Sequence, residues 1–143
     1  MTRLRQYAAL PYVVVGDRVL VLLLTSRDTG RWVIPKGWPK KRRTPAELAA
    51  LEAIEEAGVE GEVSAEPVGS YRYQKRLHFL SRAHCEVDVF ALRVVAQRIA
   101  WREKGQRRQR WLATDEAAAL VAEPDLAELI RHFVPPGGPE PVG

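Results

Sequence analysis

Apolar and β-branched residues near the start of the chain fall into short runs separated by turn residues. Tyr12–Val15 and Val19–Leu24 are joined by Gly16-Asp17-Arg18, a connection typical of a tight β-hairpin. Arg31–Pro35 forms another short run of this kind. We therefore predict three strands in this region, the first two paired as a hairpin near the start of a sheet.

The apolar stretch Tyr7–Val15 follows Arg3 and Arg5, an order that also occurs in secretory signal peptides. Pro11 interrupts the stretch, so we interpret it as a strand and not as the helical centre of a signal peptide. The longest aliphatic run, Val19–Leu24, is far shorter than the ~20 residues of a membrane-spanning helix. We expect no association with a membrane.

A helical pattern follows over Pro45–Ala57 and carries clear start and stop signals. Thr44 is a favourable N-cap, Pro45 suits the first helical position, and Glu47 completes a Thr-x-x-Glu capping box. Gly58 supplies the residue type that most often ends a helix. The preceding segment, Lys36–Arg43, is rich in basic residues, glycine and proline and is predicted to be a loop.

The second half of the chain mixes strands with short helices. Strands are predicted at Val68–Tyr73, His84–Val95 and Arg110–Leu112, and helices from Thr114 to about Val121 and from Pro124 to about Phe133. The order does not alternate as in a doubly wound fold, so we predict an α/β protein with one mixed sheet in a single domain, residues 1–134. The segment 135–143 contains four prolines and three glycines and is predicted to be disordered.

Composition narrows the class of protein but not its function. A length of 143 residues fits one domain, and Lys plus Arg (22) exceed Asp plus Glu (18) by 4. This modest excess is compatible with an anionic partner without selecting one. Cys85 is the single cysteine, which excludes an internal disulfide and a Cys-x-x-Cys site. We expect a reducing compartment, the cytoplasm.

The candidate chemistry is concentrated on the helix Pro45–Ala57. Glu52, Glu55 and Glu56 share one arc of about 100° on this helix, and unpaired like charges at this spacing destabilise it. A hard divalent cation such as Mg²⁺ or Mn²⁺ relieves that repulsion, because carboxylate oxygens are its preferred ligands. The alternative is an ordinary solvated helix face.

The densest basic segment of the chain directly precedes this acidic helix. Its cations are Lys36, Lys40, Lys41, Arg42 and Arg43. A metal-binding helix beside a phosphate-binding loop predicts a site that cleaves phosphoanhydrides. Arg72, Lys75, Arg76 and Arg82, near a predicted strand pair, are further candidates for binding distal phosphates, with a merely solubilising surface as the alternative.

Residues 37–59 read GWPKKRRTPAELAALEAIEEAGV and resemble the Nudix box, G-x5-E-x7-R-E-U-x-E-E-x-G-U, where U is aliphatic. Gly37, the three glutamates, Gly58 and Val59 match it. The resemblance extends from about residue 8 to residue 133. Within the Nudix hydrolases, Arg31–Lys41 and the later Trp101, Arg110 and Trp111 are most similar to the hydrolases of diphosphoinositol polyphosphates and diadenosine polyphosphates.

The resemblance implies a fold in which a mixed sheet is sandwiched between helices, and it implies roles for individual residues. Glu52, Glu55 and Glu56 would bind the catalytic Mg²⁺ or Mn²⁺, with the backbone carbonyl of Lys36 completing the shell. Glu52 would be the general base for the attacking water. Glu103, in a basic loop, is a candidate for an additional acid, and Trp38 is a candidate for stacking on a base.

Two positions depart from the box. Arg43 stands where the family has its first acid, and Leu51 stands where it has the arginine before Glu52. In the family those two side chains pair and help to hold the metal-binding helix, so Leu51 leaves Glu52 without its usual orienting guanidinium. As a purely structural residue, Leu51 fits the helix well, because it continues an apolar spacing with Leu48 and Ile54.

We therefore expect metal-dependent hydrolysis of a diphosphate linkage in a nucleoside- or inositol-polyphosphate type of small molecule. The alternative, motivated by Leu51, is a Nudix-fold module that binds a phosphorylated ligand or RNA without turnover. A domain that binds nucleic acid through its basic loops is a weaker hypothesis, because the chain carries no recognised nucleic-acid motif. The sequence leaves the oligomeric state open.

Overall fold

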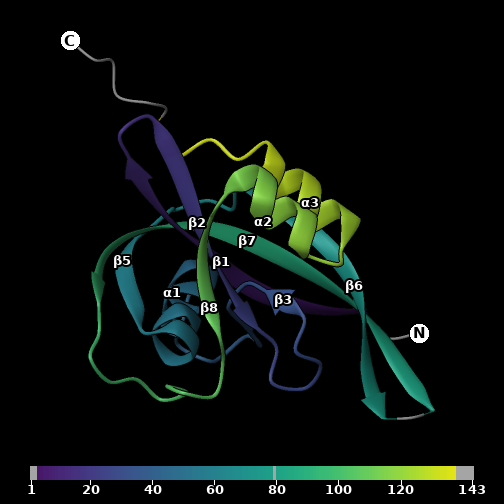
Figure 1. The fold of residues 1–143 in the computed structure, drawn as a ribbon. Coiled ribbons are helices and arrows are strands. Elements are labelled where there is room, and N and C mark those ends of the chain that lie inside the picture. Colours follow the sequence, from purple (N-terminus) through teal and green to yellow (C-terminus); the bar gives the residue numbers. More distant parts are fainter. Residues whose placement is uncertain (1–2, 79, 138–143) are drawn as a thin grey trace.

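The computed structural model describes residues 3–78 and 80–137. Within these residues eight strands form one sheet with three helices around it (Figure 1). The strands are β1 (Arg3–Val15), β2 (Arg18–Thr25), β3 (Trp32–Val33), β4 (Lys36–Gly37), β5 (Val59–Val63), β6 (Gly69–His78), β7 (Ser81–Gln97) and β8 (Gln109–Ala113). The helices are α1 (Pro45–Ala57), α2 (Thr114–Leu120) and α3 (Pro124–Arg131).

The sheet is mixed, as predicted. Its central path runs β3-β2-β1-β7-β5, and β4, β6 and β8 pair with β1, β7 and β2 respectively. The two long strands β1 and β7 pair in parallel, from Arg3 opposite His84 to Tyr12 opposite Arg93, and the other pairs are antiparallel. The hairpin end of β6 and β7 extends beyond the helices (Figure 1).

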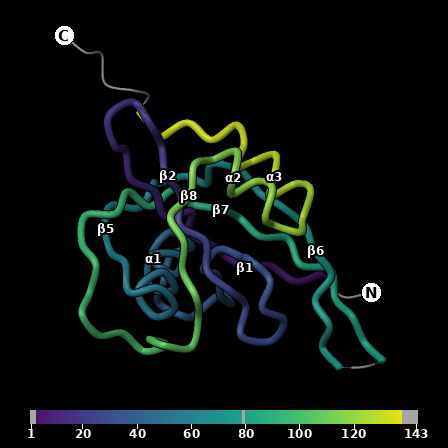
Figure 2. Tube along the Cα trace, in the orientation of Figure 1, coloured from purple at the N-terminus to yellow at the C-terminus, as the bar shows by residue number. Residues whose placement is uncertain are grey.

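Helices cover both faces of the sheet, which confirms the predicted sandwich. One apolar core joins the sheet to α2 and α3 through Leu126, Ile130 and their neighbours. A second core joins the opposite face to α1, where Phe90 and Leu92 of β7 pack with alanines of the helix. The Cα trace in Figure 2 shows α1 lying apart from the α2–α3 pair.

The capping signals of α1 are realised as the sequence predicts. The Thr44 hydroxyl accepts a hydrogen bond from the Glu47 backbone N–H at 3.1 Å, and the Thr44 N–H donates to the Glu47 carboxylate at 2.9 Å. Gly58 ends the helix in the left-handed region, with φ of 70°. The helix that carries the candidate acids is therefore fixed at both ends by local interactions.

The buried face of α1 differs from the apolar spacing of Leu48, Leu51 and Ile54. Ala49, Ala53 and Ala57 contact the sheet, whereas Leu51 and Ile54 are half-buried and belong to neither core. Alanine has the smallest side chain that still favours a helix, so it allows α1 to approach the sheet closely. Glu52 and Glu56 lie on this same buried face.

Several strand boundaries also differ from prediction. β1 begins at Arg3, upstream of the stretch Tyr7–Val15 that was interpreted as a strand, because its N-terminal half pairs with β7. Lys36–Gly37, predicted as loop, forms β4 against β1, and β5 was not predicted. These pairings are made with distant segments, so local residue patterns carry little information about them. The predicted disordered tail, 135–143, lies outside the described residues from residue 138 onward.

Ala53→Leu is expected to lower the free energy of unfolding by about 2 kcal/mol, because Ala53 is fully buried between α1 and the sheet and a larger side chain overpacks that contact. Chemical denaturation measures this effect. Ala50→Leu on the half-buried flank of the same helix is the matched control, expected to change stability by about 0.5 kcal/mol or less. Equal effects of the two changes would contradict the close packing described here.

Candidate active site

α1 places Glu52 and Glu56 one turn apart on its buried face, and the two residues are only 8% and 6% exposed. Their carboxyl groups are hydrogen-bonded to each other. Burial, followed by this shared hydrogen bond, raises the pKa of Glu56 to about 9, and burial also raises the pKa of Glu52. Burial therefore disfavours two ionised carboxylates side by side, and a bound proton or cation relieves this cost.

Gly37 explains how a carboxylate fits so close to the sheet. This residue lies in β4, opposite Tyr7 of β1, and the Glu52 carboxylate approaches the position that a side chain at residue 37 would occupy. A Cβ atom there would overlap the carboxyl group and the Cγ of Glu52. Because it has no side chain, Gly37 leaves room for the carboxyl group of Glu52.

Glu52 and Glu56 face a cleft whose lining is mainly charged. Its acids include a third glutamate, Glu103, from the loop between β7 and β8. The cations of the lining are Arg27, Lys36, Lys40, Lys75 and Arg107. Acids and bases from β4, α1, β6 and the β2–β3, β4–α1 and β7–β8 loops are therefore assembled around one opening.

Two lysines in the cleft are held over aromatic rings. The Lys36 ammonium lies 5.3 Å from the ring centre of Tyr73, and the Lys75 ammonium lies 5.8 Å from that of Trp38. Burial lowers the pKa of Lys36, and the charge of Glu56 opposes that shift. These lysines provide fixed positive charge opposite the carboxylate pair.

Other predicted site residues lie outside this cleft lining. Glu55 turns to the flank of α1, where its carboxylate is 3.8 Å from the Arg102 guanidinium. Lys41 and Arg42 are exposed. Of the basic loop, only Lys40 and the β4 residue Lys36 line the cleft.

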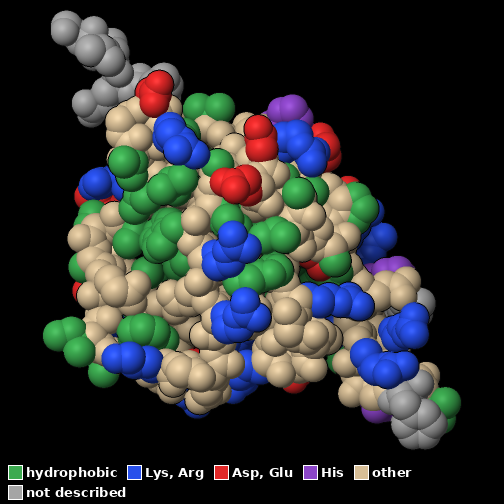
Figure 3. All heavy atoms as spheres, in the orientation of Figure 1, with side chains coloured by type: hydrophobic (Ala, Val, Ile, Leu, Met, Phe, Trp, Pro, Cys, Tyr) green, Lys and Arg blue, Asp and Glu red, His purple; other side chains and the backbone are tan. Residues whose placement is uncertain are grey.

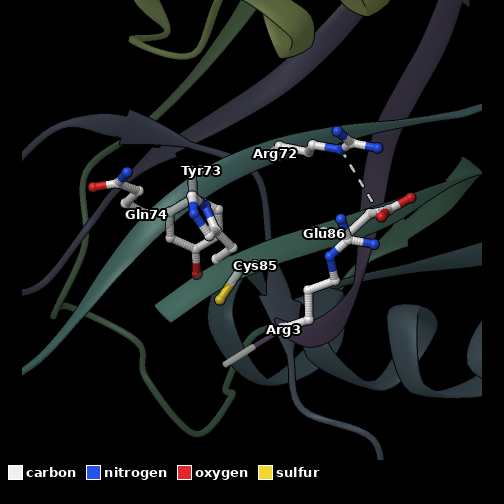
Figure 4. Close-up of a pocket in the computed structure, with 7 residues that line it drawn as sticks. Arg3, Arg72, Tyr73, Gln74, Cys85 and Glu86 are labelled. Atoms are coloured by element: carbon white, nitrogen blue, oxygen red, sulfur yellow. Dashed lines mark ion pairs between the residues drawn. The ribbon is translucent and has the colours of Figure 1, made fainter. Parts of the chain in front are cut away.

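The structure does not bring Arg72 and Arg76 to the carboxylates. Both alternate along β6 with Tyr73 and Lys75, so their side chains leave the opposite face of the strand. Arg72 lines a separate cavity and lies 3.9 Å from Glu86 (Figure 4). In the space-filling view, basic side chains gather at the projecting end of the molecule where this hairpin lies (Figure 3).

Sequence reasoning singled out Glu103 but missed Arg107, which lies beside it in the cleft. Arg107 is one of four arginines in nine residues, and nothing in its local sequence separates it from Arg108 or Arg110. For β6, the alternation of a strand could have separated Lys75 from Arg76. Lys75 lies two residues from the partly buried Tyr73 and therefore points to the same face of the strand.

Among residues 3–78 and 80–137, no group of three or more His, Cys, Asp or Glu side chains is already assembled for a metal ion. The pair Glu52–Glu56 nevertheless suits a hard divalent cation, because two adjacent buried carboxyl groups offer oxygen ligands and, once ionised, negative charge. Mg²⁺ is commonly held by one or two carboxylates, with waters and phosphate oxygens filling its octahedral shell. The donor chemistry therefore fits this cation.

The part of the chain that the structure describes contains no helix long and apolar enough to span a membrane.

Comparison with known proteins indicates the same family as the resemblance of residues 37–59 to the Nudix box. The chain matches the NUDIX domain family model over residues 4–133. It is 31% identical over 122 residues to Nudix hydrolase 16, mitochondrial, of Arabidopsis thaliana, and 33% identical over 121 residues to Nudix hydrolase 12, mitochondrial, of the same plant. Each match covers 82% of this chain and 67% or 60% of the relative, so the chain spans about two thirds of the length of these proteins.

Solved structures share the fold at lower identity. An Ap4A hydrolase of C. elegans in a binary complex has a TM-score of 0.65 at 15% identity, with 90% of this chain and 93% of that chain covered. The NUDIX domain of Shewanella oneidensis NrtR, in complex with ADP ribose, has a TM-score of 0.63 at 14% identity, with 92% and 88% covered. The chain belongs to the Nudix family.

Proposed function

We propose that this protein hydrolyses a diphosphate linkage in a small phosphorylated molecule of the nucleoside- or inositol-polyphosphate type, with Mg²⁺ or Mn²⁺ as cofactor. The observation that carries the proposal is the buried Glu52–Glu56 pair facing a cleft lined by five Lys and Arg side chains. Such a cleft provides oxygen ligands for a cation and positive charge for a phosphate chain within one opening.

Each part of the cleft has a distinct role in this proposal. Glu52 and Glu56 hold the cation, which supplies Lewis-acid polarisation of a phosphoryl oxygen when bound. Lys36, Lys40 and Lys75 bind the phosphate oxygens and orient the chain of phosphates. One carboxylate, Glu52 in our proposal, accepts the proton of the water that attacks phosphorus, and the leaving phosphate departs with the electrons of the broken P–O bond.

Family members support this substrate class without fixing the molecule. One similar structure is of an Ap4A hydrolase and another is of a NUDIX domain complexed with ADP ribose, and both Ap4A and ADP ribose contain a diphosphate linkage. The direct test measures release of phosphate or nucleotide from dinucleoside polyphosphates, ADP ribose and diphosphoinositol polyphosphates in the presence of Mg²⁺, and again after EDTA is added. Mg²⁺-dependent release supports the proposal, and ligand binding without turnover supports a binding module instead.

Replacement of Lys75 by Gln is expected to raise the KM for the hydrolysed polyphosphate about tenfold, because the substitution removes one charged contact to a phosphate oxygen in the cleft. Steady-state kinetics at fixed ionic strength measures this. Arg76→Gln is the matched control, since it removes the same charge from the other face of β6. If Arg76→Gln raises KM as much as Lys75→Gln, long-range electrostatic attraction of the substrate explains both effects. The proposed direct contact between Lys75 and a phosphate oxygen is then wrong.

A further inference from the structure

Arg107 places a guanidinium against the carboxylates of the cleft, although α1 itself has Leu51 where the box has arginine. Its Nε and Nη2 atoms lie 3.0 and 2.9 Å from Glu103 Oε1, and Nη2 lies 3.6 Å from Glu56 Oε1. Nη1 donates to the backbone carbonyl of Thr25 at 3.1 Å. The Arg107 side chain is only 10% exposed.

These contacts fix the guanidinium from two sides. Thr25 belongs to β2 and anchors it through a backbone carbonyl, while Glu103 comes from the same loop as Arg107. The planar fork of arginine allows one side chain to reach all three acceptors, which a lysine ammonium on a flexible stem does with less directional control. The remaining contact of this fork is the Glu56 carboxylate.

A purely structural role would be to pin the β7–β8 loop, residues 98–108, onto the domain. That loop already has backbone anchors that need no arginine side chain. Arg108 N–H donates to the Thr25 hydroxyl at 2.9 Å, Thr25 N–H donates to the Arg108 carbonyl at 3.0 Å, and Glu103 N–H donates to the Glu55 carbonyl at 3.0 Å. Burial of a guanidinium also costs solvation free energy. Loop anchoring therefore does not explain the position of this charge against Glu56.

We propose that Arg107 is a positioning residue, which orients the Glu56 carboxylate toward the cation with a guanidinium supplied from the β7–β8 loop. The inference rests on the proposed function, because Glu56 is a metal ligand only in that proposal. Groups that orient a metal ligand typically change metal affinity or activity by about 10- to 100-fold when removed.

The test compares Arg107→Gln with Arg108→Gln in the full chain. Arg108 is its exposed neighbour and lies over the Trp32 ring, away from the carboxylates. Mn²⁺ alone is titrated and followed by electron paramagnetic resonance, and kcat and KM are measured with any diphosphate that the wild type hydrolyses. We expect Arg107→Gln to weaken Mn²⁺ binding about tenfold and to lower kcat about 10- to 100-fold, with KM within about threefold.

The sign of the Mn²⁺ effect separates this role from its main competitor. If Arg107 only occupies the place of the metal as a competing cation, its removal tightens Mn²⁺ binding, and that result overturns the inference. Unchanged Mn²⁺ affinity, or equal losses in Arg107→Gln and Arg108→Gln, also overturns it. If Arg107→Gln fails to fold, Arg107→Lys replaces it, with Mn²⁺ binding expected to be about threefold weaker than that of the wild type.

Failure of the proposed function would be distinguishable from failure of this inference. A wild-type protein that hydrolyses no diphosphate in the presence of Mg²⁺ contradicts the proposed function. The Mn²⁺ titration needs no turnover, so it still decides whether Arg107 positions Glu56.

Discussion

Glu56→Gln is expected to abolish Mg²⁺-dependent hydrolysis, with a loss of at least about a hundredfold in kcat, while the fold is retained. The substitution keeps the approximate volume of the side chain and a polar end group but removes one of the two buried carboxyl groups. A cation bound through the pair supplies several kcal/mol of charge stabilisation in the transition state, which corresponds to a loss of this size. Steady-state kinetics and circular dichroism test the two parts of the expectation.

Glu62→Gln is the matched control, because Glu62 is an exposed glutamate that pairs with Arg93 outside the cleft. It should hydrolyse substrate at the wild-type rate. If Glu56→Gln also retains wild-type activity, the metal is bound elsewhere and the assignment of the Glu52–Glu56 pair is wrong.

Glu56→Gln should also be more stable than the wild type when metal is removed by EDTA. The folded-state pKa of Glu56 is raised to about 9, above the ~4.3 of an unfolded glutamate. A raised pKa means that the protonated form is favoured by folding, so its stabilisation is complete below about pH 4 and is lost as pH rises toward 9. Glutamine is neutral throughout and escapes that loss.

The advantage of Glu56→Gln in free energy of unfolding should therefore grow from near zero at about pH 4 to on the order of 1–3 kcal/mol at pH 7. Urea denaturation in EDTA at several pH values measures it. An advantage that does not change with pH would show that Glu56 is ionised without penalty in the fold.

Gly37→Ala is expected to lower kcat by about a hundredfold and to destabilise the protein by about 1–3 kcal/mol. Gly37 is not among the glycines with positive φ, so its backbone accepts alanine without conformational strain. The effect comes from the added Cβ, which would occupy the space of the Glu52 carboxylate. Glu52 must then leave the position in which it pairs with Glu56.

A double-mutant cycle with Glu52→Ala tests this steric origin. In the Glu52→Ala background the side chain that the new Cβ would meet is absent, so Gly37→Ala should destabilise by less than about 0.5 kcal/mol. If the cost of Gly37→Ala is the same in both backgrounds, the glycine is needed for the β4 backbone and not for space around Glu52. Thermal and urea denaturation of the four proteins give the comparison.

The sequence predicted the parts of this protein that depend on residues close together in the chain. Thr44, Glu47 and Gly58 determine where α1 begins and ends, and the interactions that they make lie within a few residues of one another. The helical spacing of Glu52 and Glu56 likewise places both acids on one side of α1 before any tertiary contact is considered. The spacing between the glycines and glutamates of the box was sufficient to indicate the Nudix family.

The sequence was less informative about pairing between distant segments. β4 and β5 each exist because a short segment meets β1 or β7, and isolated segments of this length have weak intrinsic preferences. The apolar spacing of Leu48, Leu51 and Ile54 also did not indicate which side of α1 packs on the sheet. Leu51 is more hydrophobic than Ala53, but the close approach of helix and sheet selects the smaller residue.

The assembly of the cleft was decided by tertiary structure. Strand parity sends Lys75 into the cleft and Arg76 away from it, and the path of the β7–β8 loop brings Glu103 and Arg107 to acids about fifty residues earlier in the chain. Loop conformation depends on where both ends are anchored, and the local sequence of the loop does not contain that information. The sequence by itself therefore determined the carboxylate helix and its family, and only the fold decided which cations face the carboxylates.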